Sequence, residues 1–497
     1  MNRKITITIN TICSKLLWVC FLSVFTFQIN AQQFTQHGVG NGLSQPQQFD
    51  YEDIDGDGFT DIIVPEFSGN SISVLYGTGN ISNYTTITYG PLLVGGSIIK
   101  PWTALSLDID ADGDLDIVFS NYANSTSAND GIYWIENLGN RSFGSLQFLY
   151  ELNRCRYIGK VNYDADAEYE LLALGDSNDP INVRVLNVVG GTVSTLLQRT
   201  ANRRPLHGLF TDIANVGNLD LVLSKFGRGN EADGSTDSTN GVQTLNGPTY
   251  SFGINLITNM PTTSAGTRKT VAGDFNEDGN TDFIAVNAAG TTSSLKYYGQ
   301  GGMGEGTILL SSDGSKNMVS LTSGDYDNDG VLDIAVVDNA TDEILLYKNT
   351  AVDGIALGTI AFNAPTILSS TVIDPNWIES VDLDNDGDLD LIVSSNNGGG
   401  AGSGNITVFE NDTITLSASS FSLEENNIRV YPNPTDTVLN VASNEAIIQI
   451  RIFNVLGKEI LKTTSKVIDV SQLNQGIYLI EIEGDNNQTI IKRFVKK

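Results

Sequence analysis

The nine residues Asp382-Leu383-Asp384-Asn385-Asp386-Gly387-Asp388-Leu389-Asp390 place five carboxylates at alternate positions around one glycine. The apolar run Leu391-Ile392-Val393 follows at once. A turn of this kind before a β-branched run predicts a hairpin whose loop gathers side-chain oxygens around one point. The pattern returns along the chain, and its spacing decides the fold.

Four more full copies of this loop begin at residues 53, 108, 274 and 325. Two weaker copies begin at residues 162 and 212, so that all seven start 50–62 residues apart. Each unit contains three or four short apolar runs without helical periodicity, which is typical of a β-propeller blade. The sequence therefore predicts an all-β chain with a seven-bladed β-propeller over residues 32–415.

Closure of the ring is also predicted. The last unit has only two clear strands after its loop, whereas residues 33–39 precede the first unit and have no blade of their own. We expect this segment to form the outer strand of the seventh blade.

The loops have the chemistry of calcium sites. Calcium takes six to eight hard oxygen ligands, here from side chains at loop positions 1, 3, 5 and 9 and from the backbone carbonyl at position 7. Glycine at position 6 permits the turn. The expected ligands are Asp53, Asp55, Asp57, Phe59 and Asp61; Asp108, Asp110, Asp112, Asp114 and Asp116; Asp274, Asn276, Asp278, Asn280 and Asp282; Asp325, Asp327, Asp329, Val331 and Asp333; and Asp382, Asp384, Asp386, Asp388 and Asp390.

The two weaker copies differ from this pattern in different ways. The copy at 162 has Ala167 in place of glycine, and it predicts a sixth, weaker site. Its ligands would be Asn162, Asp164, Asp166, Glu168 and Glu170. The copy at 212 has Ala214 and Val216 where carboxylates are needed, so we expect no ion there.

Other metals and another loop type fit less well. Magnesium demands stricter octahedral geometry, and zinc prefers His or Cys, which this chain nearly lacks. An EF-hand needs glutamate at position 12. The full loops instead have an apolar residue there: Val64, Phe119, Ala285, Val336 and Val393.

Bulk properties point to an exported protein. Residues 1–31 read as a signal peptide, with Arg3 and Lys4 before an apolar run at 16–27 that is too short to span a bilayer. Cys155 would be the one cysteine of the mature chain, so calcium rather than disulfides is expected to stabilise it. The net charge of −30 argues against nucleic acid as a partner. No later segment is apolar enough to cross a membrane.

Residues 32 to about 415 resemble the FG-GAP/VCBS repeats of the integrin α-chain propeller. The calcium loops carry the resemblance, and residues 131–144 (GIYWIENLGNRSFG) match the third-strand pattern of that family. The resemblance implies that each calcium loop joins the first two strands of a blade on one face of the ring. It also implies binding and scaffolding more often than catalysis.

A second resemblance covers the end of the chain. After a Ser/Thr-rich linker at 416–427, residues 428–497 contain alternating strands with Gly and Asn turns, beginning near Val430-Tyr431-Pro432. We expect a small β-sandwich. This segment resembles the type A C-terminal sorting domain of type IX secretion in Bacteroidetes. The resemblance implies recognition by the outer-membrane secretion machinery and a mature protein that is released or anchored at the surface.

Basic residues gather just before the loops. Eight of them, with four aromatic residues, lie five to nine residues before a loop. These positions correspond to the start of the first strand, on the face of the ring opposite the loops. They suggest a site for an anionic glycan or an acidic protein loop; alternatively, they balance charge and cover the channel mouth. The candidate residues are Lys100, Trp102, Arg154, Arg156, Tyr157, Arg203, Arg204, His207, Arg268, Lys269, Lys316 and Trp377.

An enzyme is the alternative function. A polysaccharide lyase needs a base and a cation beside a uronate carboxylate, and Tyr157 or His207 with neighbouring arginines fits that description. No catalytic signature is visible in the sequence. A calcium-binding adhesion or binding module is therefore the preferred interpretation.

Overall fold

The computed structural model describes residues 34–122, 129–164, 168–175, 181–201, 204–213, 217–226, 241–247, 249–255, 265–289, 292–299, 307–311, 315–350, 360–412, 428–431, 435–443, 447–454, 458–484 and 489–497. The chain divides into two compact units, residues 1–414 and 415–497. The described residues form strands and turns without any α-helix, which confirms the all-β prediction. The predicted signal peptide at 1–31 and the linker at 416–427 lie outside the described residues.

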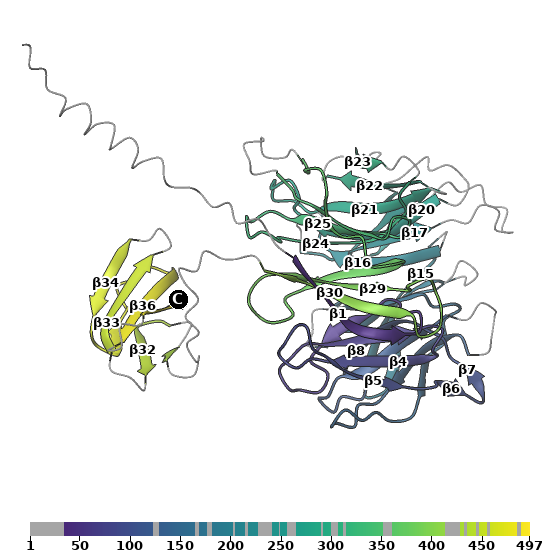
Figure 1. Ribbon diagram of the computed structural model, residues 1–497, viewed down its shortest axis with the longest axis horizontal. Helices are drawn as coiled ribbons and strands as arrows, with labels where there is room; N and C mark the ends of the chain where they lie inside the picture. Colours follow the sequence, from purple (N-terminus) through teal and green to yellow (C-terminus); the bar gives the residue numbers. More distant parts are fainter. Residues whose placement is uncertain are drawn as a thin grey trace, which may run out of the picture. The chain divides into compact units, whose positions relative to one another are not determined.

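In the first unit, each repeat contributes consecutive antiparallel strands (Figure 1). The first three repeats comprise β2 (Asp50–Glu52), β3 (Asp61–Glu66), β4 (Ser71–Tyr76) and β5 (Thr85–Tyr89); β8 (Pro101–Leu107), β9 (Asp116–Asn121), β10 (Gly131–Ile135) and β11 (Gln147–Tyr150); and β12 (Tyr157–Val161), β13 (Glu170–Leu174), β14 (Val183–Val189) and β15 (Thr192–Arg199). A small hairpin of β6 (Leu93–Val94) and β7 (Ser97–Ile98) lies between the first two repeats.

The next repeats follow the same order. They comprise β16 (Arg204–Thr211), β17 (Asp220–Phe226), β18 (Gly241–Asn246) and β19 (Ser251–Asn255); β20 (Ala265–Gly273), β21 (Asp282–Ala289), β22 (Thr292–Tyr298) and β23 (Thr307–Ser311); and β24 (Met318–Gly324), β25 (Asp333–Asp338), β26 (Glu343–Tyr347) and β27 (Thr366–Ser369). Each acidic loop joins the first and second strand of its repeat, as the family resemblance implied.

The last repeat is completed by the start of the chain. Strands β28 (Pro375–Val381), β29 (Asp390–Ser395) and β30 (Gly404–Asn411) pair in order, and β1 (Phe34–Leu43) adds to β30 as the outer strand. The register runs antiparallel from Phe34 opposite Asn411 to Leu43 opposite Gly404. Figure 1 shows β1, β30 and β29 side by side. The predicted closing strand is confirmed, and it extends to residue 43.

Apolar residues fill the spaces between consecutive repeats. The second strands β3, β9 and β13 are buried along their whole length, because both faces of their sheets are covered. One apolar cluster contains residues of the first and second repeats, another those of the second and third, and a further one joins the last repeat to the first. This packing of successive sheets in a closed series defines a β-propeller.

The number of blades stays a prediction. The strands from β16 to β23 form one eight-stranded sheet, in which the fourth and fifth repeats are joined by the single pair Phe226 and Gly266.

The second unit has two sheets, with strand orders β31-β32-β35 and β34-β33-β36-β37. Their inner faces share an apolar core that includes Leu439, Ile450, Ile468, Ile480 and Phe494. This is the small β-sandwich that the sequence predicts. The strands are β31 (Ile428–Tyr431), β32 (Val438–Ser443), β33 (Ile447–Asn454), β34 (Glu459–Thr463), β35 (Val467–Asp469), β36 (Gly476–Gly484) and β37 (Thr489–Lys496).

Candidate functional site

The aspartate at position 9 ties each full loop to its blade. In the first loop, the two carboxylate oxygens of Asp61 accept the backbone N–H groups of Ile54, at 3.0 Å, and of Gly77, at 2.8 Å. Gly77 lies just after the third strand. Asp116, Asp333 and Asp390 accept bonds from the equivalent backbone groups of their own repeats. This carboxylate therefore has a structural role whether or not an ion is bound.

Burial changes the acidity of these aspartates. It raises the pKa of Asp61, Asp333 and Asp390 to about 7, and that of Asp116 to about 6. The backbone N–H donors act in the opposite direction but do not cancel the effect of burial. A cation beside each carboxylate would favour its charged form and lower the pKa again.

The aspartate at position 1 closes the turn. Asp53 accepts the backbone N–H of Asp57 at 3.0 Å and that of Gly58 at 2.8 Å, and Asp325 accepts the matching pair from Asp329 and Gly330. The glycine at position 6 has a positive φ, 92° at Gly58, which side chains disfavour. The turn thus directs the side chains of positions 1, 3 and 5 inward.

Carboxylate oxygens converge in four of the five full loops. In each of these loops, three aspartates offer oxygens that lie within 4.8 Å of one another. Asp110, Asp327 and Asp382 each keep one buried oxygen without a hydrogen-bond partner. Burying such an acceptor is costly unless a cation or donor reaches it, and hard oxygens are what calcium prefers. The residues therefore fit a calcium ion. The four groups are Asp53, Asp55 and Asp57; Asp108, Asp110 and Asp116; Asp325, Asp327 and Asp333; and Asp382, Asp384 and Asp390.

The loop at 274 has the same turn with a different interior. Asp274 accepts the backbone N–H groups of Asp278 and Gly279, as in the other loops. The amide nitrogen of Asn276, however, lies 3.2 Å from Asp278 Oδ2 and 2.9 Å from the Tyr297 hydroxyl. An amide at position 3 removes one negative charge, so this loop offers a weaker attraction for a cation.

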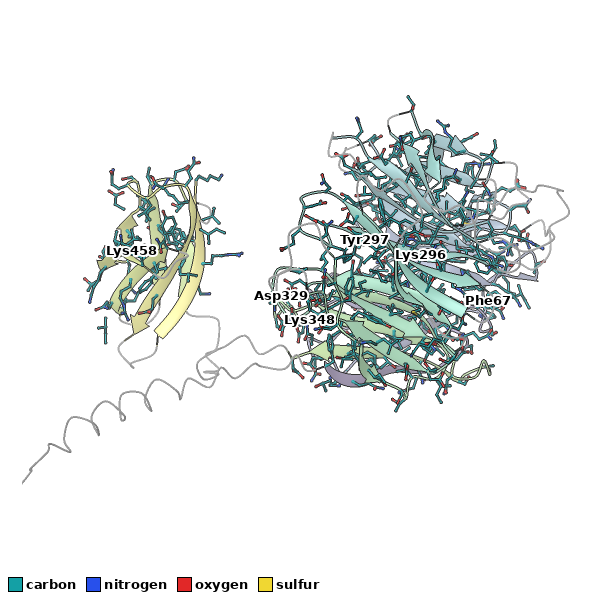
Figure 2. All side chains as sticks on the ribbon, turned by 90° about the horizontal axis from the view of Figure 1, so that it is seen from above. Phe67, Lys296, Tyr297, Asp329, Lys348 and Lys458 are labelled. Atoms are coloured by element: carbon teal, nitrogen blue, oxygen red, sulfur yellow. The ribbon has the colours of Figure 1, made fainter. Side chains whose placement is uncertain are left out.

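Two basic side chains that sequence reasoning missed lie against the loops. Arg141 Nε is 2.6 Å from Asp55 Oδ2, and its guanidinium lies 4.3 Å from the centre of the Tyr76 ring. Lys348 pairs with Asp327 and lies 3.4 Å from Asp329 Oδ2 (Figure 2). Both residues follow the third strand of a repeat, and that position is the signal that could have identified them. Their placement indicates how strongly these loops attract positive charge.

The weaker copies keep hydrogen bonds between the position-9 carboxylate and the backbone. Glu170 accepts the backbone N–H of Tyr163 at 2.6 Å, so it takes the role of the position-9 aspartate in the loop at 162. Asp166 of that loop lies outside the described residues.

At the other end of the first strands, irregular pairing turns side chains toward the channel. Five of these strands have a register shift near their start, as between Pro101 and Ala104 and between Pro375 and Trp377. Such bulges re-aim side chains. The result is a cavity of about 370 Å³, here called the mouth cavity. The residue six positions before each of the seven loops lines it: Gln47, Trp102, Arg156, Leu206, Arg268, Val319 and Asn376.

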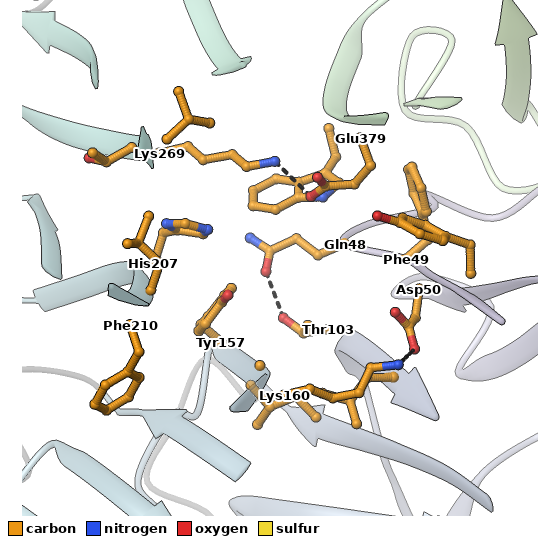
Figure 3. Close-up of a pocket in the computed structure, with 18 of the residues that line it drawn as sticks. Gln48, Phe49, Asp50, Thr103, Tyr157, Lys160, His207, Phe210, Lys269 and Glu379 are labelled. Carbon is orange, nitrogen blue, oxygen red and sulfur yellow. Dashed lines mark hydrogen bonds and ion pairs between the residues drawn. The ribbon is translucent and has the colours of Figure 1, made fainter. Parts of the chain in front are cut away.

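Residues five positions before the loops form the floor of the mouth cavity. Gln48, Tyr157, His207 and Lys269 surround a second space of about 500 Å³ (Figure 3). Trp377 lines both spaces. The Tyr157 and His207 rings meet at 4.9 Å, and Lys269 Nζ lies 4.2 Å from the Trp377 ring.

The floor holds the two candidate bases of the enzyme alternative. Burial raises the pKa of Tyr157 above its usual range, and it lowers the pKa of His207 well below the usual value. His207 is therefore neutral, and Tyr157 keeps its proton. Both residues pack in the interior of the channel.

Cations and aromatic rings meet at the mouth. The Arg156 guanidinium lies 4.0 Å from the Tyr122 ring and 5.5 Å from the Trp102 ring. Arg268 lies 5.7 Å from the Phe226 ring. Burial lowers the pKa of Arg268, and no carboxylate offsets this effect or pairs with Arg268 among the described residues. The mouth therefore contains a partly buried positive charge that no described acidic group balances.

Other predicted residues lie elsewhere. Lys100 sits 4.9 Å from the Phe67 ring, and Phe67 in turn touches Trp102. Lys316 pairs with Glu343, and neither it, Arg154 nor the buried Arg204 lines the mouth cavity. Arg203 lies outside the described residues. Sequence reasoning missed the amides of the mouth, which are Gln47, Gln48, Asn317, Asn339 and Asn376. The position six before each loop could have identified Gln47 and Asn376.

Comparison with protein families agrees with this architecture. Residues 53–119, 274–336 and 325–393 match the FG-GAP-like repeat, and residues 429–497 match the secretion system C-terminal sorting domain. The chain is thus a β-propeller protein with FG-GAP-like repeats. It ends in the predicted type IX sorting domain, which directs it to secretion and to the outer membrane or cell surface. The described residues contain no helix with the length and hydropathy that crossing a bilayer requires.

Several solved structures are similar over most of their length. The BBS1N chain crystallised with ARL6DN is 10% identical, with a TM-score of 0.46, over 77% of this chain and 98% of that one. A putative oxidoreductase (glucose dehydrogenase) from Thermus thermophilus is 10% identical, with a TM-score of 0.39, over 76% and 100%. The V. cholerae biofilm matrix protein Bap1 is 11% identical, with a TM-score of 0.39, over 77% and 91%. No curated protein matches the chain in sequence.

Proposed function

We propose that this protein is a secreted or surface-attached binding module that holds calcium in its blade loops and an anionic glycan in its mouth cavity. Residues 1–31 would be its signal peptide, and the type IX machinery would recognise its sorting domain. Convergent aspartates support the calcium sites, and the charge and lining of the mouth support the glycan site.

Calcium would neutralise the clustered carboxylates. In the loop at 382, Asp382, Asp384 and Asp390 offer three oxygens around one point, and Asp386 adds a fourth carboxylate from position 5. Like charges within a few ångströms repel by roughly 1–4 kcal/mol per pair, depending on solvent exposure. A divalent cation replaces this repulsion with attraction and so stabilises the hairpin that the loop closes.

The main support for the glycan site is the charge of Arg268. Its guanidinium is partly buried, has no carboxylate partner among the described residues and faces the same cavity as Arg156. A carboxylate or sulfate group of a ligand would balance this charge, because the planar guanidinium fork matches such groups. The two tryptophans of the mouth offer faces for sugar rings, and its amides suit sugar hydroxyls.

The size and the surroundings of the mouth favour a small anionic unit of a longer polymer. A volume of about 370 Å³ is at the lower end of the range for ligand pockets. The overall charge of −30 would repel a polyanion at most places on the surface. Binding is therefore expected to be local and to depend on the two mouth arginines.

The experiment compares binding of polygalacturonate, alginate and chondroitin sulfate to the full chain in calcium. Replacing both arginines, Arg156→Ala with Arg268→Ala, should weaken binding of the recognised polymer at least ten-fold, since each charge-assisted contact contributes roughly 1.5–3 kcal/mol. Lys296→Ala, which removes a cation outside the mouth, is the matched control and should bind as the parent does. Equal binding by the double variant, or no binding of any anionic polymer by the parent, would contradict the glycan site.

A further inference from the structure

Three of the repeats have a buried asparagine at the end of the third strand or just after it. Asn137, Asn349 and Asn411 are at most 6% exposed. The backbone N–H of each donates to the position-9 aspartate of its own loop: Asn137 to Asp116 at 2.7 Å, Asn349 to Asp333 at 2.7 Å and Asn411 to Asp390 at 2.8 Å. Each asparagine is therefore anchored to the carboxylate that would complete its own calcium site.

The side chain of each asparagine reaches the preceding loop as well. Asn349 Nδ2 donates to the carbonyl of Leu332 in its own loop, at 3.1 Å, and to the carbonyl of Phe275 in the preceding loop, at 2.7 Å. Asn137 makes the same pair of hydrogen bonds, to the carbonyls of Leu115 and Ile54. Asn411 makes it to the carbonyls of Leu389 and Tyr326. Both protons of the amide are used, and residues 74–85 apart in sequence are joined.

The contacted residue in the preceding loop is itself bound to a metal-loop carboxylate. Phe275 donates its N–H to Asp282, and Tyr326 donates its N–H to Asp333. Asp333 thus receives one bond from Tyr326 and another from Asn349. A continuous series of hydrogen bonds therefore runs from the loop at 274 through the loop at 325 to the loop at 382.

The series is interrupted where glycine takes the place of asparagine. Gly77 donates its N–H to Asp61, but a Cβ atom there would come within 2.6 Å of the Thr60 carbonyl oxygen. Gly247 is equivalent, with a Cβ that would lie 2.1 Å from the Leu219 carbonyl oxygen. No asparagine fits at either place. The loop at 382 is consequently not bridged to the loop at 53 in this way, although both are full loops.

We propose that Asn137, Asn349 and Asn411 are positioning residues that couple calcium binding between neighbouring loops. The full loops then form two cooperative groups, one at 53 and 108 and the other at 274, 325 and 382. The proposal rests on the proposed calcium sites. An ion that fixes the position-9 aspartate also fixes the N–H group that donates to it, and the asparagine passes this restraint to the next loop. Such coupling typically changes affinity about 5- to 150-fold.

Calcium titration of the metal-free full chain, followed by calorimetry, tests this coupling. The parent should bind with a Hill coefficient above one. Asn349→Ala combined with Asn411→Ala should bring the Hill coefficient of the second group close to one. It should also raise the calcium concentration at half-saturation of that group at least about five-fold. Asn121→Ala is the matched control, because Asn121 is equally buried and uses both ends of its amide away from the loops. It should leave the isotherm unchanged.

A second variant serves if the double asparagine variant does not fold. Asp325→Asn with Asp327→Asn disables the middle loop of the second group, and it should weaken calcium binding at 274 and 382 while leaving 53 and 108 unaffected. Non-cooperative binding by the parent, or equal effects of this variant on both groups, would overturn the coupling but leave the calcium sites in place. If the parent binds no calcium at all, the proposed function fails as well.

Discussion

The loops at 382 and 212 share the same hydrogen bonds at positions 1 and 9, the parts of both loops that the structure describes. Asp390 accepts the N–H groups of Leu383 and Asn411, at 3.0 and 2.8 Å, and Asp220 accepts those of Ile213 and Gly247, at 3.1 and 2.8 Å. The position-1 aspartates, Asp382 and Asp212, each accept the N–H of the glycine at position 6. The two loops differ at positions 3 and 5, where the loop at 212 has Ala214 and Val216 in place of Asp384 and Asp386.

This difference separates architecture from ion binding. Positions 1 and 9 hold the turn in both loops, so their carboxylates are needed whether or not calcium is present. In the loop at 382, Asp384 accepts the backbone N–H of Asp386 at 3.3 Å, and Asp386 accepts that of Asp388 at 2.9 Å. The oxygen of an asparagine could accept the same bond, so a carboxylate there mainly adds charge near other carboxylates. An aspartate at these positions is best explained by a cation, whereas an aspartate at position 9 is not evidence of one by itself.

Removal of calcium should have the largest effect on stability. With EDTA in place of millimolar calcium, we expect the melting temperature of the propeller to fall by on the order of 10 °C. A single site at one hundred times its Kd contributes about 2.7 kcal/mol, and several sites are involved. Differential scanning calorimetry measures the change. An identical melting temperature in both buffers would remove the calcium interpretation.

Two single substitutions in one loop should separate the role of position 9 from that of position 5. Asp390→Asn should destabilise the protein by roughly 1–3 kcal/mol even in EDTA, because its amide nitrogen must face one of two buried N–H donors. Asp386→Asn should destabilise it in calcium only. Denaturant unfolding of both variants in each buffer provides the measurement. If Asp390→Asn had no effect in EDTA, the separation of architecture from ion binding would be wrong.

A smaller effect is expected from the channel floor. His207 belongs to the repeat whose loop lacks the central carboxylates, and burial, with Lys269 nearby, keeps the pKa of His207 well below its usual value. The unfolded chain therefore binds a proton before the folded chain does, and the contribution of neutral His207 to stability is full above about pH 6.5 and declines as the pH falls.

Thermal unfolding at pH 7.5 and pH 5.5 in saturating calcium isolates this effect. On acidification, the melting temperature of His207→Gln should fall by about 1–3 °C less than that of the parent. Asp50, Lys160 and Glu379 share the same cavity and are unchanged in the variant, so their contributions cancel in the comparison. The same pH dependence in both proteins would show that His207 is not responsible.

The mouth was only partly predictable from sequence. The distance to the next loop predicts Trp102, Arg156 and Arg268, and these three residues do line one cavity. Lys316 satisfied the same rule but pairs with Glu343, and Arg204 is buried away from the cavity. A window of five residues includes side chains that point both ways from a strand, and the bulges decide which of them face the channel.

The repeat, the chemistry of the loops and the sorting tail can be read from the sequence alone, because each is encoded by a short contiguous pattern within one hairpin or one small domain. Which residues share the mouth, and how neighbouring loops are joined, depends on the folded chain. Arg156 and Arg268 line the same cavity from different repeats, and Asn411 reaches the carbonyl of a residue 85 positions away. Contacts of this kind depend on the packing of successive sheets, and local sequence does not specify that packing.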